Sequence, residues 1–444
     1  MKTFFSTTWE NLSSSYWFIP TIMSILATGL SFLTVHLDTL VNAKWARAAG
    51  WLWAGGPEGA RSVLSTIAGS TITVAGVVFS ITIVTLSLAS SQFGPRLLRN
   101  FMNDRATQVV LGVFVSTFLY SLLILRTIRG TDATSFVPFL SVTSGILFAV
   151  ASVGFLIFFI HHVPNSILAE NLVGRVAEEL QFRVDRLYPD PLGDGPRERK
   201  SDIDAQLPRA FAAEAKPIHA PKSGFIQAID EESLLELAAR EGMIIQLCRR
   251  PGDFIAEEAA IALAWPADKI TPEFAEKCSD TFFFGWHRTP NQDIEYAIDQ
   301  LVEVAVRALS PGINDPFTAM SCIEWLGVAL IKVGRRQIPS ALHYDEENHL
   351  RLVTNVTDYA GIAAAALNQI RQYGRSSVGV VARLLDMLAR VAAELPKAED
   401  REVLLGHARA IRDDGVAATK NERDQADIEE TFALAQRALT VSDR

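Results

Sequence analysis

Hydroxyl side chains recur at seven-residue spacing in the most apolar part of the chain. Seven residues make about two helical turns, so these side chains share one helix face. Hydroxyl oxygens can bind ions weakly, as channel linings do, and small side chains also let membrane helices pack closely. The spacing therefore predicts a polar conduit or a packing face, and leaves both open. The face consists of Thr66, Ser70, Thr73, Gly76, Ser80 and Ser87.

This face belongs to an uncharged segment, residues 62–95, which Arg61 and Arg96 bound. A helix needs roughly 20 apolar residues to cross a bilayer. The segment is longer than that, so we expect a membrane helix whose end projects from the bilayer or packs inside protein. A small, hydroxylated face must be covered by another helix, by a second copy of the chain, or by water.

A second candidate site follows at the end of this segment. Gly94 is expected to end the helix and Pro95 to open the next. One interpretation is a sharp turn at the membrane surface, with the arginines near anionic headgroups. The other is a channel mouth whose arginines attract anions. The candidate residues are Gln92, Gly94, Pro95, Arg96 and Arg99.

A third candidate lies at residues 310–318, where Pro-Gly and Asp-Pro occur between two helical patterns. Asp315 is expected to cap a new helix, and Pro316 suits its first position. The segment is then a tight interhelical turn. Alternatively, Asn314 and Asp315 form a ligand or partner site.

Motifs for catalysis, cofactors and metals are missing from the sequence. It has no phosphate-binding glycine loop, no His-Glu-x-x-His, no Gly-x-Ser-x-Gly and no Cys-x-x-Cys. Its three cysteines are far apart and match no metal or disulfide spacing. We therefore expect no enzyme activity, no cofactor and no metal. An isoelectric point near 5.5 argues against a nucleic-acid partner.

Apolar periodicity predicts four transmembrane helices that position these sites in residues 1–164. They lie near residues 17–37, 66–90, 107–125 and 137–160. His36 and Asp38, at the end of the first helix, are expected to reach headgroups or water. Four crossings put both termini on one side, and the arginines after the second helix place that side in the cytoplasm.

The remaining chain is predicted to be a cytoplasmic α+β, mostly helical domain. Residues 1–165 carry 9 Lys and Arg against 5 Asp and Glu, whereas the rest carries 32 against 45. Prolines and apolar periods divide it into parts. We predict a helical stalk at residues 165–187, a Pro-rich linker at 188–223, a small mixed α/β module at 224–266 and a mainly helical domain at 267–444.

Two sequence runs carry a family resemblance. They are Ser91-Gln92-Phe93-Gly94-Pro95-Arg96 and the run from Ala308 to Ala319, which contains Ser-Pro-Gly-Ile-Asn-Asp-Pro-Phe. With these runs the chain resembles the bacterial predicted membrane proteins of domain-of-unknown-function family 2254, over nearly its whole length. The resemblance implies a bacterial inner-membrane protein with an N-terminal four-helix region and a cytoplasmic domain. It implies no activity.

Two functional hypotheses follow. In the first, copies of the chain form a homo-oligomer in the lipid bilayer, and the second helix of each lines a path for a small ion or solute. In the second, the protein does not conduct, and it is a membrane-tethered sensor or scaffold whose cytoplasmic domain binds a partner or ligand.

Overall fold

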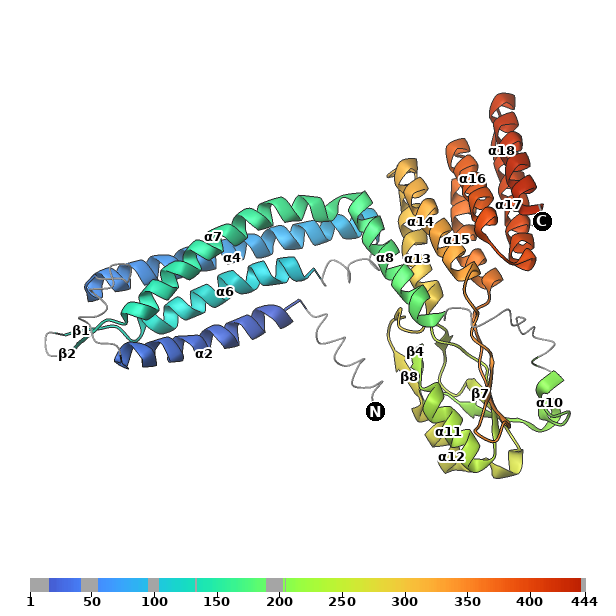
Figure 1. Ribbon diagram of the computed structural model, residues 1–444, viewed down its shortest axis with the longest axis horizontal. Helices are drawn as coiled ribbons and strands as arrows, with labels where there is room; N and C mark the ends of the chain where they lie inside the picture. The colour runs from blue at the N-terminus through green and yellow to red at the C-terminus, as the bar shows by residue number, and fades with distance from the viewer. Residues whose placement is uncertain are drawn as a thin grey trace. The chain divides into compact units, whose positions relative to one another are not determined.

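The computed structural model describes residues 16–40, 55–94, 104–131, 134–188, 203 and 205–440 (Figure 1). The chain divides into two compact units, Met1–Asn171 and Leu172–Arg444. We call them the N-terminal and C-terminal units and describe each by itself.

In the described part of the N-terminal unit, four long apolar helices pack together. A short antiparallel hairpin, β1 (Arg129–Thr131) and β2 (Thr134–Phe136), joins the last two. Each helix holds a run of apolar residues long enough to cross a bilayer. The helices are α2 (Phe18–Leu40), α4 (Pro57–Phe93), α6 (Arg105–Leu125) and α7 (Phe139–Ile167).

Helix α6 holds this unit together, because α2, α4 and α7 all pack against it. Tyr120 of α6 is fully buried, and its ring meets Phe148 of α7 edge-on. Its hydroxyl lies 2.9 Å from the Thr34 hydroxyl of α2 and donates to the Ser141 carbonyl of α7 at 3.2 Å. One side chain therefore ties three helices together while its polar atom stays satisfied.

Two sheets form the first part of the C-terminal unit. The five-stranded sheet has the order β3-β7-β5-β10-β9, and the three-stranded sheet the order β6-β4-β8. Among the described strands of this unit, β10 and β5 are the one parallel pair. The strands are β3 (Lys216–His219), β4 (Gly224–Ile229), β5 (Ile244–Leu247), β6 (Phe254–Ile255), β7 (Ala260–Trp265), β8 (Phe282–Gly285), β9 (Leu342–Tyr344) and β10 (Leu350–Val353).

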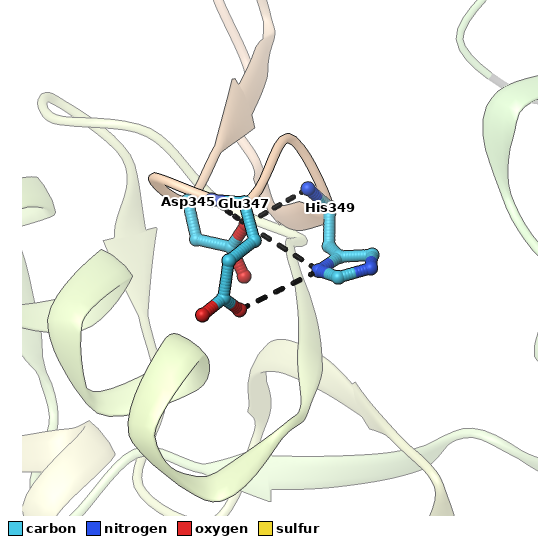
Figure 2. A group of neighbouring side chains, drawn as sticks. All are labelled: Asp345, Glu347 and His349. Atoms are coloured by element: carbon cyan, nitrogen blue, oxygen red, sulfur yellow. Dashed lines mark hydrogen bonds and ion pairs between the residues drawn. The ribbon is translucent and has the colours of Figure 1, made fainter.

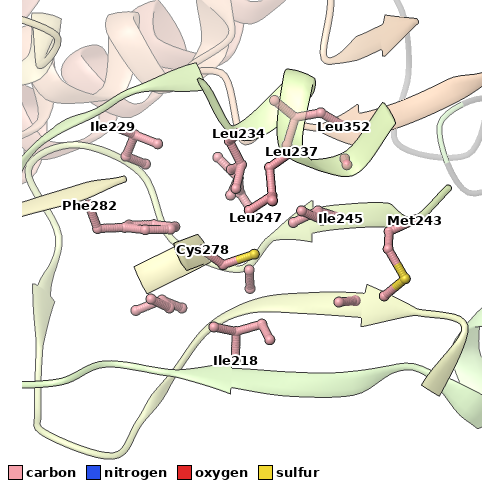
Figure 3. Close-up of a cluster of buried hydrophobic side chains, with 14 of the residues drawn as sticks. Ile218, Ile229, Leu234, Leu237, Met243, Ile245, Leu247, Cys278, Phe282 and Leu352 are labelled. Atoms are coloured by element: carbon pink, nitrogen blue, oxygen red, sulfur yellow. The ribbon is translucent and has the colours of Figure 1, made fainter. Parts of the chain in front are cut away.

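The core of this part is apolar (Figure 3). Helices α11 (Glu231–Glu241) and α12 (Pro272–Asp280) contribute Leu234, Leu237 and Cys278 to it. Alternate residues of the strands point into the same core, as the period-two pattern requires. Leu352, from a strand about 100 residues further along the chain, completes the core.

Helices make up most of the remaining unit. Most carry an apolar face and pack against their neighbours, so α13 contacts α14 and α15, and α16 contacts α17 and α18. They are α13 (Ile294–Ala308), α14 (Pro316–Gly334), α15 (Tyr359–Gly374), α16 (Val378–Glu394), α17 (Ala398–Ala418) and α18 (Glu422–Thr440).

Part of the expected linker is a strand. Within residues 188–223, where the sequence predicts a Pro-rich linker, the structure forms a short helix, α10 (Phe211–Glu214), and β3. Pro217 is compatible with β3 because this strand lies at the sheet edge, where one side needs no hydrogen bonds. The sequence predicts a domain boundary at residue 266. In the structure, two strands that follow this residue pair with strands that precede it, β8 with β4 and β10 with β5.

Pro164 does not start a new helix. Helix α7 continues through it to Ile167, and the break falls at Leu168, whose backbone is extended. Helix α8 (Ala169–Leu187) follows, where the sequence predicts the stalk. Because Pro164 has no backbone N–H, it cannot donate to the carbonyl four residues earlier, so α7 lacks that hydrogen bond near its end.

A fifth helix is apolar enough to cross a membrane, whereas the sequence analysis predicts four. This helix is α14, and half of its most apolar stretch is buried inside the protein. It packs on α13, α15 and α16. Its Glu324 pairs with Arg383 and Arg390 of α16, both at 2.8 Å. Burial in a helical core explains its apolar composition as well as a membrane does.

Candidate functional site

The hydroxyl face of α4 is not covered by the other helices of its unit. All six of its residues are exposed: Thr66, Ser70, Thr73, Gly76, Ser80 and Ser87. The opposite side of α4 packs inside the unit. The contrast is sharpest between neighbours, since Val78 is 1% exposed and Val77, on the hydroxyl-face side, is 53% exposed.

Another helix could approach this face closely at Gly76, because no atoms fill the space beside this glycine. A Cβ added at Gly76 would meet nothing within 4 Å, and the same holds for Gly69, about two helical turns away. Small residues in a membrane helix permit another backbone to come close. The structure therefore brings the six predicted residues together on one accessible face.

Part of the face satisfies its own polar groups. The Thr66 hydroxyl donates to the Ser62 carbonyl and the Thr73 hydroxyl to the Gly69 carbonyl, both at 2.8 Å. We find no hydrogen bond for the Ser80 or Ser87 hydroxyl among the described residues. The second half of the face therefore retains hydroxyl groups that could bind water or a solute.

The candidate turn after α4 is described only at its start. Gln92 is exposed in the last helical turn. Gly94 has φ of +110°, a conformation that suits glycine, and its N–H donates to the Ser90 carbonyl at 3.2 Å. Pro95, Arg96 and Arg99 lie outside the described residues.

A buried carboxylate in the N-terminal unit has a role that the sequence analysis missed. Asp38 is 8% exposed, although it was expected to reach headgroups or water. It accepts hydrogen bonds from the backbone N–H of Leu140 at 2.8 Å and of Ser141 at 2.9 Å. Asp38 of α2 thereby caps α7, whose own preceding residue, Pro138, makes no side-chain cap. In the sequence, the one signal for this role is Pro138, which precedes α7 and cannot cap it with its side chain.

At the other candidate turn, Asp315 caps α14 as predicted. Its carboxylate accepts from the Thr318 N–H at 3.2 Å and from the Thr318 hydroxyl. Asn314 is exposed with φ of +52°, which asparagine tolerates better than most residues. The structure therefore gives Asp315 a capping partner and leaves the Asn314 side chain in solvent. Next to them, Phe317 is strongly exposed.

Three side chains gather at the β9–β10 turn in a way that resembles a metal site: Asp345, Glu347 and His349 (Figure 2). The Asp345 oxygens are already occupied. One accepts from the backbone N–H groups of Glu347 and His349 at 3.1 and 2.8 Å, and the other from Arg351 at 2.6 Å. Such a carboxylate organises the turn. These bonds hold the pKa of Asp345 below its usual value.

A polar cavity of about 200 Å³ lies within the C-terminal unit. The first helical turn of α11, the turn after β5, the start of α13 and the segment after β10 line it. The charged and aromatic residues of the lining are Tyr188, Glu231, Arg250, Asp293 and His343. The sequence analysis proposed no site here, because six separated segments contribute to it, including the end of α8 and the start of the β9–β10 hairpin.

Two arginines neutralise carboxylates beside this cavity. Arg250 donates from one nitrogen to both Glu295 oxygens at 2.8 Å. Arg288 pairs with Asp293 at 2.8 and 3.0 Å and with Asp299 at 2.8 Å. Burial raises the pKa of Glu295, and the Arg250 charge opposes that effect. Burial lowers the pKa of Arg288, but its bonds to Asp293 and Asp299 outweigh this and raise it.

Comparison of the sequence with known proteins places this chain in a family. The model of a family described as predicted membrane protein (DUF2254) matches residues 13–390. The chain is 30% identical to the uncharacterised proteins Rv1290c of Mycobacterium tuberculosis and Mb1321c of Mycobacterium bovis, over 98% of this chain and 82% of each relative. No solved structure matches the chain. The resemblance seen in the sequence is therefore confirmed, and the chain belongs to the DUF2254 family of predicted membrane proteins.

Proposed function

We propose that copies of this protein assemble in the bacterial inner membrane and surround a polar conduit lined by the hydroxyl face of α4. In this proposal α2, α4, α6 and α7 cross the bilayer, α14 does not, and both termini are cytoplasmic. The conduit passes a small ion or solute. The C-terminal unit lies in the cytoplasm and regulates passage, without enzyme activity.

The observation that carries the proposal is the exposure of the hydroxyl face. Helices α6 and α7 pack against the opposite side of α4 and leave this side exposed. Thr66 to Ser87 covers 21 residue steps, or about 30 Å of helix, which equals the hydrocarbon thickness of a bilayer. A polar stripe of this length has little to gain from contact with lipid tails.

The composition of the stripe also favours a conduit. Residues 62–95 hold no charge, so a passing ion would meet weak hydroxyl ligands and no deep electrostatic trap. Conduction needs binding that is weak enough for the solute to leave. Arg96 and Arg99, if they form the mouth, would favour anions there.

The proposal that α14 stays outside the membrane rests on its charges. Glu324 is bonded to Arg383 and Arg390, and Lys332 lies 2.7 Å from Asp185 of α8. Burial raises the pKa of Glu324, but the two arginines outweigh this and lower it. A helix with these fixed ion pairs belongs to a water-exposed unit.

The second candidate function is a non-conducting membrane-tethered sensor or scaffold. The open surface at Gly69 and Gly76 favours it, because a second copy of α4 could pack there and exclude water. Thr66 and Thr73 bond to their own backbone, which lowers the need for an aqueous path. The C-terminal unit would then bind a partner or ligand, at Asn314 and Asp315 or elsewhere.

Flux through liposomes separates the two candidates. We would reconstitute the full chain and follow efflux of K⁺, Cl⁻ and urea. Ser80→Thr keeps the hydroxyl. Ser80→Val gives a side chain of nearly the same shape as threonine but without the hydroxyl. The conduit predicts flux that Ser80→Thr preserves and Ser80→Val reduces. Liposomes that stay silent with correctly inserted protein would contradict the conduit and favour the scaffold. Equal flux in both variants would show that the hydroxyl does not line the path.

A further inference from the structure

The polar cavity of the C-terminal unit contains one charged side chain without a partner. Glu231 occupies the first position of α11, and its carboxylate makes no hydrogen bond or ion pair with the described residues. Burial raises the pKa of Glu231, because it disfavours the charged carboxylate. A cation or a strong hydrogen-bond donor therefore stabilises a carboxylate in this setting.

The other charged groups of the lining are already used. Arg250 is held by Glu295 and by the Thr357 hydroxyl. Asp293 accepts from Arg288 and from the Tyr296 N–H. Arg250 and Arg288 together face three carboxylates, those of Glu295, Asp293 and Asp299, so neither arginine has charge left to compensate Glu231.

Uncharged groups of the lining are engaged as well. The Tyr188 hydroxyl donates to the Thr357 carbonyl at 3.2 Å. The Thr354 hydroxyl lies 3.1 Å from Nε2 of His343. Burial, followed by the charge of Glu295, raises the pKa of Tyr188, so its phenol stays neutral. The lining therefore holds an aromatic ring, which suits a cation, and no uncompensated positive charge.

The size and walls of the cavity restrict the occupant. About 200 Å³ holds several waters or one small organic molecule, and is below the 300–1,000 Å³ typical of drug-sized ligands. Pro251, Ile294 and Val356 supply apolar wall between the polar groups. A Ca²⁺ or Mg²⁺ ion needs about six oxygen ligands, and one free carboxylate with apolar walls does not provide them.

We propose that this cavity binds a small organic cation of the ammonium or guanidinium class, with the Glu231 carboxylate as its counter-ion. The ammonium or guanidinium group pairs with Glu231, and the remainder of the molecule contacts the apolar wall. The inference concerns binding alone, so it stands whether or not α4 lines a conduit.

Ligand-observed NMR on the full chain in detergent tests the proposal. The probes are methylguanidinium, ethylammonium, and N-methylurea, which has nearly the shape of methylguanidinium but no charge. At ordinary ligand efficiencies a ligand of about five heavy atoms binds at about millimolar concentrations or more weakly, and the best ligands of this size reach about micromolar, so titrations span both ranges. We expect saturable binding of the two cations and at least about tenfold weaker binding of N-methylurea.

Two pairs of variants make the test specific to the cavity. Glu231→Gln should weaken cation binding by at least about tenfold. Glu232→Gln removes the same charge from the next residue of α11, which is exposed and does not line the cavity, and should leave binding unchanged. Asn355→Trp, on another lining segment, should block binding by filling the space. Circular dichroism checks that each variant is folded.

Three results would overturn the proposal. The first is that neither cation binds saturably to the folded wild-type chain. The second is equal loss of binding in Glu231→Gln and Glu232→Gln, which would reduce the effect to general charge. The third is that Mg²⁺ or acetate competes with methylguanidinium as well as ethylammonium does, which would assign the cavity to a different class of ligand.

Discussion

The carboxylate of Asp38 accepts both the backbone N–H and the hydroxyl of Ser141, at 2.9 and 2.6 Å. The two residues belong to different apolar helices, α2 and α7. The N–H groups at the start of a helix have no intrahelical partner, and an unpaired donor at membrane depth is costly. A buried carboxylate, which would itself be costly alone, therefore satisfies the start of a neighbouring helix.

We predict that Asp38→Ala destabilises the N-terminal unit by about 2–3 kcal/mol, because buried N–H and hydroxyl donors lose a charged acceptor. Asp38→Asn keeps one acceptor oxygen and should cost less. His36→Ala, two residues away and exposed, is the control. Denaturation of the full chain in detergent measures all three. Equal stability of Asp38→Ala and His36→Ala would show that the cap contributes nothing.

The bond between Arg250 and Glu295 fixes the turn after β5 to α13. Both side chains are less than a third exposed. We expect Arg250→Ala to lower the free energy of unfolding of the C-terminal unit by about 2 kcal/mol, since it leaves Glu295 partly buried without its partner. Arg249→Ala changes the neighbouring exposed arginine and should have an effect within about 0.5 kcal/mol. Chemical denaturation compares them, and a smaller effect at Arg250 than at Arg249 would contradict the role assigned to the pair.

Gly252 lies in the turn after β5 and has φ of +98°. A Cβ there would clash with the carboxylate of Asp293, which caps α13 and pairs with Arg288. Gly252→Ala should therefore destabilise the C-terminal unit by about 2 kcal/mol or more. Gly406→Ala, inside α17 with open space around its Cβ, should be neutral or stabilising. Thermal midpoints measure both, and an unchanged midpoint for Gly252→Ala would refute the packing described.

Asp345 predicts a pH dependence with a definite sign. Its pKa in the folded protein is lowered by the His349 N–H and then by Arg351. The stabilisation is therefore complete above the ordinary aspartate pKa of about 3.9 and is lost as the pH falls through the lower folded value. Asp345→Asn should be less stable than wild type at pH 6, and the difference should shrink below about pH 4. A difference that stays constant down to the lowest pH would contradict this.

The same network predicts that the Asp345, Glu347 and His349 group does not depend on a metal. Its central carboxylate already has three donors. Adding EDTA or Zn²⁺ should leave the thermal midpoint unchanged, with Glu347→Ala as a control for loss of an exposed charge. A rise in the midpoint with Zn²⁺ that Glu347→Ala abolishes would show a metal site instead.

Local patterns made several elements predictable from the sequence. The apolar period over residues 293–309 corresponds to α13, and Asp293 and Asp315 cap the helices that follow them. The short apolar runs at Leu342–Tyr344 and Leu350–Val353 flank a polar turn and form the β9–β10 hairpin. In each case the information lies within about twenty residues of chain.

Features that depend on distant pairing could not be predicted. The parallel pairing of β10 with β5 joins Leu352 to Ile245 across about 100 residues, and no local pattern encodes it. Pro217 indicated a linker because proline is rare inside sheets, but an edge strand accepts it. Asp38 looked like a residue for the membrane surface, because its partner Ser141 belongs to a different helix.

The candidate site could be predicted only in part, because the sequence shows local helix geometry and not the contacts between distant segments. Seven-residue spacing places Thr73 and Ser80 on one face by helix geometry alone, so the sequence could predict that face. Which face α6 and α7 would cover depends on tertiary packing, so the sequence left that open. The cavity around Glu231 was missed because its walls come from segments far apart in the chain.

Accessibility of α4 to water tests the central proposal most directly. Single cysteines replace Thr73, Ser80, Val78 or Phe79 in a Cys248→Ser background, and a membrane-impermeant thiol reagent is applied to the assembled protein in membranes. The remaining native cysteines are buried. Burial raises the pKa of Cys278 to about 12 and also raises that of Cys322, so neither thiol should react.

Each position reports one environment. Val78 is packed against the protein, and Phe79 is exposed about 100° around the helix from Ser80, where we expect lipid. The conduit predicts that cysteines at Thr73 and Ser80 react rapidly and that those at Val78 and Phe79 do not. If Thr73 and Ser80 remain as unreactive as Val78, the hydroxyl face meets another helix or lipid, and the conduit does not exist.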